Sequence, residues 1–140
     1  MKKNGFTLVE LLAVIVILAI LLTVAIPNVI GITQRVKEKM YCSKVSDIES
    51  AAKLYGQDYI DEVESNGNTM TIHVYTLIEN NLYKKESDDC ILNSNDKYCV
   101  SDPRDDSKMD DKTITLTKKD KRITATFNYN NDADKNSCTK

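Results

Sequence analysis

The stretch MKKNGFTLVELLAVIVILAILLTVAI, residues 1–26, decides the fold of this 140-residue chain. Over residues 8–26, which are 19 positions, only Glu10 and Thr23 are not aliphatic. As a helix with a rise of about 1.5 Å per residue, this run is about 28 Å long, close to the roughly 30 Å hydrocarbon layer of a bilayer. The stretch therefore predicts an N-terminal helix that can cross a membrane.

The residues that flank the apolar run predict its orientation. Lys2 and Lys3 precede it, and the positive-inside rule keeps such a basic start in the cytoplasm and sends the following body outward. A removed secretory signal fits less well, because its apolar stretch is only about 7–15 residues long and residues 23–25 are a weak cleavage site. An uncleaved anchor is the better of these two interpretations.

Glu10 is the feature that a plain membrane anchor does not explain. A carboxylate near the centre of a membrane helix costs about 2.5–3.5 kcal/mol, and less near an interface. No lysine, arginine or histidine lies between Phe6 and Thr33. The sequence therefore predicts a partner for Glu10 from elsewhere: lipid head groups, another chain or a new positive charge.

The segment GFTLVE, residues 5–10, follows a short basic leader and opens the apolar helix. In this setting it resembles the prepilin signature of type IV pilins and their pseudopilin relatives. The resemblance implies that a membrane aspartyl peptidase, the prepilin peptidase, cuts after Gly5 on the cytoplasmic face. It implies further that Phe6 becomes the N-methylated terminus, and that Glu10 matches the glutamate that the family uses in subunit assembly.

The cut at Gly5 would create the positive charge that Glu10 lacks. The new α-amine of Phe6 has a reference pKa of about 7.7–8.0 and is mostly cationic at neutral pH. Glu10 of an incoming subunit could pair with that amine on its neighbour, where a missing partner costs about 3–5 kcal/mol. Loss of Lys2 and Lys3 also makes the formal net charge of −2 two units more negative.

Pro27 and Gly31 stand near the end of the apolar run. Proline lacks an N–H and disrupts the helix behind it, and glycine loosens the following turn. A simple kink at the membrane exit is one interpretation. The resemblance favours the other, a flexible or partly unwound stretch in the assembled filament.

An amphipathic pattern continues the helix beyond the apolar run. Apolar side chains recur at steps of four and three, which indicates a helical face: Tyr41, Val45, Ile48, Ala52, Tyr55 and Tyr59. We predict one long helix from about Phe6 to Ile60, with its first half in membrane or filament core and its second half packed on the body. The expected divisions are a leader (1–5), a hydrophobic transmembrane helix (6–33) and an extracytoplasmic domain (34–140).

The rest of the chain predicts a small antiparallel sheet. Thr69–Val74 could be a short strand, Tyr75–Leu82 a brief helix or turn, and Lys84–Asp111 a loop. Thr113–Thr117 and Ile123–Tyr129 alternate in polarity and predict a C-terminal hairpin. The apolar face of this hairpin can cover the helix, and its threonines face outward. The expected fold is therefore α+β and pilin-like: a long N-terminal helix packed on a small antiparallel β-sheet.

Four cysteines, Cys42, Cys90, Cys99 and Cys138, all follow the apolar run. They contain no C-x-x-C pair and His73 is the only histidine, so a structural zinc site is disfavoured. An even count in a small exported domain favours disulfides, with three possible connectivities. A local Cys90–Cys99 bridge across a short polar loop is preferred, which leaves Cys42 with Cys138. That long closure could contribute about 3–5 kcal/mol.

Composition disfavours several other functions. Basic and acidic clusters alternate, so no direct nucleic-acid binding is evident in this chain. The chain has one histidine, which we interpret as a surface residue of a strand, and it lacks a G-x-S-x-G motif. Both features argue against an enzyme or a bound cofactor. An acidic loop is a possible calcium site, although a solvated loop is the favoured interpretation: it contains Asp102, Asp105, Asp106, Asp110 and Asp111.

Together these features predict a structural subunit of a type IV pilus-like filament. It would be a single-pass membrane protein before assembly and part of a cell-surface filament afterwards. The resemblance implies related minor pilins, the prepilin peptidase and a membrane assembly platform as partners. A pseudopilin of a DNA-uptake (competence) or type II secretion apparatus is the alternative, and a monomeric membrane-anchored binding module is a weaker one.

Overall fold

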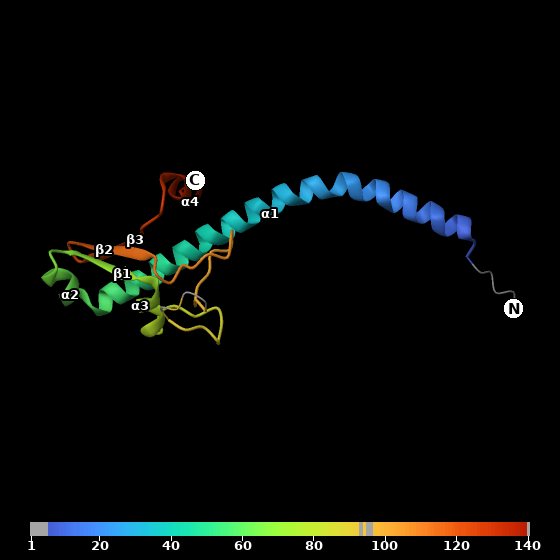
Figure 1. The fold of residues 1–140 in the computed structure, drawn as a ribbon. Coiled ribbons are helices and arrows are strands. Elements are labelled where there is room, and N and C mark those ends of the chain that lie inside the picture. The colour runs from blue at the N-terminus through green and yellow to red at the C-terminus, as the bar shows by residue number, and fades with distance from the viewer. Residues whose placement is uncertain (1–5, 93, 95–96, 140) are drawn as a thin grey trace. The chain divides into compact units, whose positions relative to one another are not determined.

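The computed structural model describes residues 6–92, 94 and 97–139 of the chain. It has the expected α+β class, a long N-terminal helix with a three-stranded antiparallel sheet (Figure 1). The chain divides into two compact units, residues 1–36 and residues 37–140. The elements, in order, are α1 (Leu8–Asp58), α2 (Ile60–Ser65), β1 (Thr69–His73), α3 (Val74–Glu79), β2 (Thr113–Lys119), β3 (Arg122–Phe127) and α4 (Asp132–Cys138).

The first unit consists of the start of α1. Every side chain described between residues 6 and 23 is exposed, although nearly all are apolar. In the part of the chain that the structure describes, no helix is both long and apolar enough to cross a membrane.

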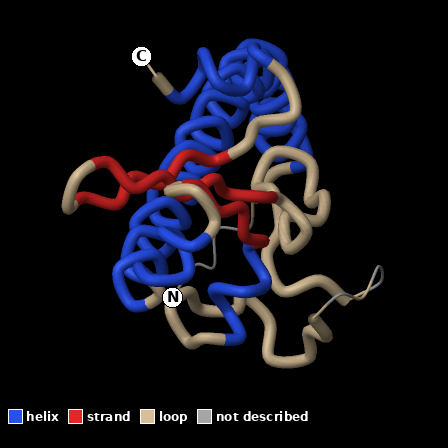
Figure 2. Tube along the Cα trace, turned by 90° about the vertical axis from the view of Figure 1, so that its left-hand side faces the viewer, coloured by secondary structure: helices blue, strands red, loops and turns tan. Residues whose placement is uncertain are grey.

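The second unit is built around the sheet, which is red in Figure 2. Its strands lie in the order β1-β2-β3. Ile114 of β2 pairs with Ile72 on one side and with Phe127 on the other. All three side chains are buried, whereas the intervening threonines of β2 and β3 are exposed or half-buried. Alternation along each strand therefore gives the sheet one apolar face and one polar face, as the hairpin pattern predicted.

The second half of α1 supplies the other side of the core. Tyr41, Val45, Ile48, Ala52 and Tyr55 are all buried and join the side chains of the sheet in one hydrophobic cluster. The helical face predicted from the four-and-three spacing is thus confirmed. The last tyrosine of that pattern, Tyr59, is half-buried and lies just before α2.

At Gly56, α1 packs closely against side chains of the sheet. A Cβ atom at this position would lie 2.8 Å from Cγ2 of Ile123 and 3.3 Å from Cδ1 of Leu116. Real Cβ atoms do not come that close to another heavy atom. Packing therefore favours glycine here, even though glycine weakens the interior of a helix.

Several boundaries differ from the prediction. Helix α1 ends at Asp58, and the chain continues as the separate helix α2. A turn follows in which Gly67 (φ 75°) and Asn68 (φ 65°) adopt the left-handed conformation that glycine and asparagine tolerate best. Strand β3 stops at Phe127, two residues earlier than predicted, because the chain then turns toward α4, which the sequence pattern did not indicate.

Candidate assembly site

The N-terminus of α1 is closed by a reciprocal pair of side chains. Thr7 precedes the first helical residue, and its hydroxyl accepts a hydrogen bond from the Glu10 N–H at 3.3 Å. The carboxylate of Glu10 in turn accepts from the Thr7 N–H and the Thr7 hydroxyl, both at 3.0 Å. This is a capping box, T-x-x-E, which satisfies N–H groups that a helix start otherwise leaves without partners.

The capping box changes the account of Glu10. The prediction that lipid head groups, another chain or a new positive charge must supply the partner is incomplete, because Thr7 already binds the carboxylate. Both Thr7 bonds end on Oε2, so the carboxylate retains acceptor capacity on Oε1. The T-x-x-E spacing was visible in the sequence and was the signal that could have identified this pair.

Phe6 lies directly beside this site and is 82% exposed. Gly5, on the other side of the predicted cleavage point, lies outside the described residues, as does the rest of the leader 1–5. The cut after Gly5 and the methylation of Phe6 therefore stay predictions. Cleavage would bring the new terminus within four residues of Glu10.

The apolar side chains described after Glu10 in the first unit are exposed. Between residues 6 and 22 the large hydrophobic side chains are 48–82% exposed. Soluble monomers rarely leave such a large continuous apolar surface in water. This part of α1 is therefore a candidate surface for contact with lipid or with other protein chains.

Pro27 and Gly31 both lie inside α1, and the helix runs through them without interruption from Leu8 to Asp58. A Cβ atom on Gly31 would meet nothing within 4 Å. This glycine is not required by packing within the chain, which contrasts with Gly56. Unwinding of the stretch in a filament stays a prediction.

The four cysteines form two disulfides. Cys42 of α1 is joined to Cys138 at the end of α4, over a sequence separation of 96, and Cys90 is joined to Cys99 over a separation of 9. This is the connectivity that was preferred from the sequence. The first bridge fixes the C-terminal segment to the long helix, and the second closes a short loop.

The acidic loop differs from the favoured interpretation as a solvated segment. Asp110 is fully buried, and its carboxylate accepts from the Cys99 N–H at 2.8 Å and the Val100 N–H at 2.7 Å. Asp102 is 5% exposed and is paired with Arg104 at 2.7 Å. Two of the five carboxylates are thus buried against protein groups. Within the described residues, no group of histidine, cysteine or acidic side chains is arranged to hold a metal ion.

Arg104 connects three segments of the body. Its guanidinium pairs with Asp102 in its own loop at 2.7 Å and with Asp134 of α4 at 2.6 Å, and it stacks over the ring of Tyr41 in α1 at 3.6 Å. Hydrogen bonds to Asp102, and then to Asp134, raise the pKa of Arg104 although burial opposes them. Burial raises the pKa of the Tyr41 phenol to about 12, although the Arg104 charge opposes that shift.

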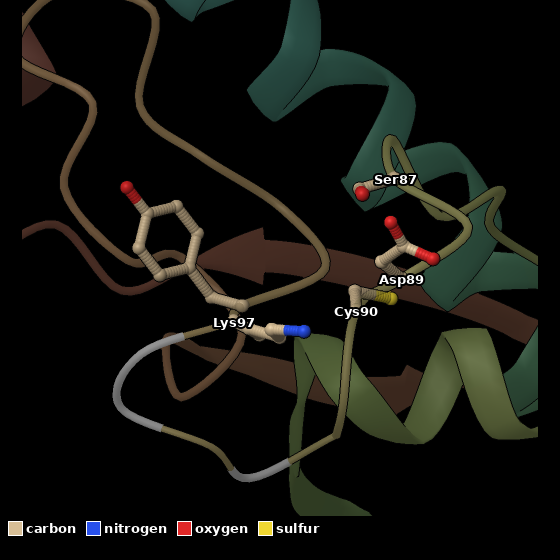
Figure 3. A pocket seen from close by; sticks show the side chains of 5 residues that line it. Ser87, Asp89, Cys90 and Lys97 are labelled. Atoms are coloured by element: carbon tan, nitrogen blue, oxygen red, sulfur yellow. The ribbon is translucent and has the colours of Figure 1, made fainter.

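A hollow borders the Cys90–Cys99 loop, and Figure 3 shows the side chains that line it. It offers the hydroxyl of Ser87, the carboxylate of Asp89 and the ammonium of Lys97 beside the Cys90–Cys99 disulfide.

His73, the single histidine, lies at the end of β1, where its Nδ1 is 3.1 Å from the Asp111 carbonyl oxygen. The half-buried ring also stacks on Tyr75, so the prediction of a plain surface residue was only partly right.

Comparison with known proteins identifies the N-terminal segment. A family described as "Prokaryotic N-terminal methylation motif" matches residues 1–26. A type II secretion system core protein G from Pectobacterium carotovorum subsp. carotovorum is 35% identical over 57 residues, and one from Aeromonas hydrophila is also 35% identical over 57 residues. The protein of the same description from Escherichia coli (strain K12) is 33% identical over 57 residues.

These matches cover 41% of this chain and 36%, 40% and 39% of the three relatives. The chain thus spans about two fifths of the length of the curated relatives that it matches. No solved structure matches it. These findings support the resemblance of the N-terminal part of this chain to type IV pilins and pseudopilins.

Proposed function

We propose that this protein is a prepilin that becomes a structural subunit of a type IV pilus-like filament. The observation that carries the proposal is the uncovered apolar start of α1, which directly follows the GFTLVE motif and its Thr7–Glu10 capping box. Such a helix needs neighbours, and copies of the same helix in a filament can supply them. The role is structural rather than catalytic.

In this mechanism the prepilin is held in the membrane with residues 34–140 outside the cell. Prepilin peptidase cuts after Gly5 and methylates Phe6, and a membrane assembly platform then adds the subunit to related pilins. The α-amine of Phe6 on one subunit pairs with Glu10 of the next. Oε1 of Glu10 is the atom suited to this pairing, because both Thr7 hydrogen bonds end on Oε2.

A pseudopilin of a type II secretion apparatus is the second candidate. The observation that favours it is the description of the relatives, which are type II secretion system core proteins G. The two functions share the same processing and the same helix packing. Imaging the cell surface with a tagged subunit separates them, because a pilus gives long fibres and a secretion pseudopilus gives short stubs or none.

The mature N-terminus tests the proposal. Mass spectrometry of the protein from the cell envelope should identify Phe6 as the first residue, with one added methyl group. An intact Met1 would contradict the proposal, and so would cleavage near residue 25, which would mark an ordinary secretory signal.

The pairing of Glu10 is tested by Glu10→Ala. Processing at Gly5 should stay largely intact, while incorporation into filaments should fall sharply, since an unpaired buried charge costs about 3–5 kcal/mol. Glu38→Ala is the matched control, because it removes an exposed carboxylate from the same helix. Normal filament yield from Glu10→Ala would contradict the pairing mechanism.

A further inference from the structure

The C-terminal helix α4 is attached to the body in an unusual way. Among its seven residues none is buried. Its only apolar side chains are those of Ala133, which is exposed, and Cys138, which is half-buried. The hydrophobic effect therefore contributes little to holding this helix in place, in contrast to α1.

Two side chains of α4 make the attachment instead. Cys138 forms the disulfide with Cys42 of α1, and Asp134 pairs with Arg104 at 2.6 Å. Just before the helix, Asn130 accepts a hydrogen bond from Lys112 at 2.9 Å. Asn131 accepts from the Asp134 N–H and caps α4 itself rather than binding the body. The disulfide is thus the one covalent tether among a few polar contacts.

Tyr41 lies where these contacts meet. Its side chain is only 4% exposed, under the guanidinium of Arg104. Tyr41 and Arg104 line a hollow of about 330 Å³ together with Asn131 and Asp134 from the C-terminal segment. Displacement of α4 would remove one wall of this hollow and the Asp134 contact that helps hold Arg104 over the Tyr41 ring.

The remainder of the body does not depend on α4. Loop residues 84–111 have their own anchors on α1, because Lys44 pairs with Glu86 and donates to the Ser101 carbonyl at 2.6 Å. The hydrophobic cluster is formed by α1, the sheet and the segments between them, with Cys138 only at its margin. The body can therefore stay folded when the C-terminal segment leaves.

We propose that α4 is a redox-controlled latch: the Cys42–Cys138 disulfide closes it over Tyr41, and reduction of that bond releases α4 while the sheet and α1 stay packed. The reductant is a dithiol. One of its thiolates attacks a sulfur of the bridge, the S–S bond breaks, and the second thiol resolves the mixed disulfide. The protein gains two thiols, and the dithiol leaves as a disulfide after giving up two electrons and two protons.

The test uses the full chain in detergent micelles. Cys42→Ser/Cys138→Ser opens the latch permanently, and Cys90→Ser/Cys99→Ser is the matched control that removes the other bridge. Hydrogen exchange reports the amides of α4, β2 and β3, and nitration followed by peptide mass spectrometry reports the accessibility of Tyr41. In the latch variant the α4 amides should exchange about tenfold faster or more, because the helix is no longer tied to α1 and can open locally.

In the latch variant Tyr41 should also become reactive, while β2 and β3 keep the amide protection that α4 has lost. The control should keep both α4 and Tyr41 protected. Dithiothreitol added to the control should reproduce the open state, and reoxidation should reverse it. Continued protection of α4 and Tyr41 in the latch variant would overturn the proposal, and equally fast exchange throughout the sheet would show a general stabiliser instead of a latch.

Discussion

A small polar network holds the loop of residues 84–111 to α1. Glu86 is its centre: Oε2 accepts from the N–H and the hydroxyl of Ser101, both at 3.0 Å, while Oε1 pairs with Lys44. Burial opposes ionisation of this carboxylate, but the bonds from Lys44 and Ser101 outweigh it and hold the pKa of Glu86 below its usual value of 4.5.

Because the pKa of Glu86 is lowered in the folded state, this carboxylate makes the free energy of unfolding increase as the pH rises. Glu86 contributes stability above its unfolded pKa, and this contribution is lost as the pH falls through the folded pKa. We expect the free energy of unfolding to drop from about pH 5 downward, and to drop less steeply in Glu86→Gln. Urea denaturation at a series of pH values measures both slopes.

Asp88→Asn is the control for that experiment. Asp88 is fully exposed in its pair with Lys85, and such pairs contribute little. Its removal should leave the pH dependence unchanged. Identical slopes for wild type and Glu86→Gln would show that the Glu86 network does not stabilise the fold.

Individual residues were the least predictable level of the structure. Spacing alone could not tell Asp110, which is buried beneath backbone N–H groups, from the exposed Asp106 in the same loop. Whether a charged side chain is buried depends on which N–H groups the fold brings near it. These groups can belong to residues far away in the sequence, so a local sequence pattern does not reveal them. The Thr7–Glu10 pair differs, because a capping box is local and could have been identified.

Among the elements, the contact between α1 and the sheet is set by Gly56. Replacement of a helical glycine by alanine usually gains up to about 1 kcal/mol. Here the added methyl group would meet Cγ2 of Ile123 at 2.8 Å, and overpacking costs about 1–3 kcal/mol. We expect Gly56→Ala to lower the free energy of unfolding by about 1 kcal/mol, measured by urea denaturation.

Gly31→Ala is the matched substitution, because a Cβ there meets nothing within 4 Å. It should not destabilise the protein. Ile123→Ala should restore part of the packing in Gly56→Ala, so a double-mutant cycle should give a favourable coupling. A stable Gly56→Ala with no coupling would mean that α1 shifts easily on the sheet.

The elements in which apolar residues recur at a regular spacing were predicted correctly. The buried face of α1 and the alternation of β2 and β3 follow directly from where apolar residues recur in the sequence. The short helix α4 was missed because it has no apolar face, so no period could reveal it. Gly56 was missed for a similar reason, because a close contact between two elements cannot be recognised from the sequence of either element alone.

At the scale of the whole molecule, the core of the body is independent of the first unit. Every residue of the described hydrophobic cluster is Tyr41 or a later residue. We expect the fragment 37–140 to fold alone as a soluble monomer with both disulfides. Its free energy of unfolding should lie within about 1 kcal/mol of the full chain in detergent, as measured by circular dichroism and analytical ultracentrifugation.

The full chain without detergent is the comparison for that fragment. It should self-associate, because its uncovered apolar helix favours contact with other copies over water. A fragment that is unfolded or aggregated would mean that the first unit contributes to the body. A monomeric full chain in water would contradict the assembly role of the helix.

The buried carboxylate of Asp110 has a consequence for oxidative folding. It binds the N–H groups of Cys99 and Val100, and because these bonds do not involve sulfur they can hold the backbone of one cysteine without the disulfide. Cys90 lies nine residues away and needs only a short closure to reach it. The local bridge should therefore close first, which leaves Cys42 and Cys138 as the only remaining pair and steers the chain away from its two mispaired isomers.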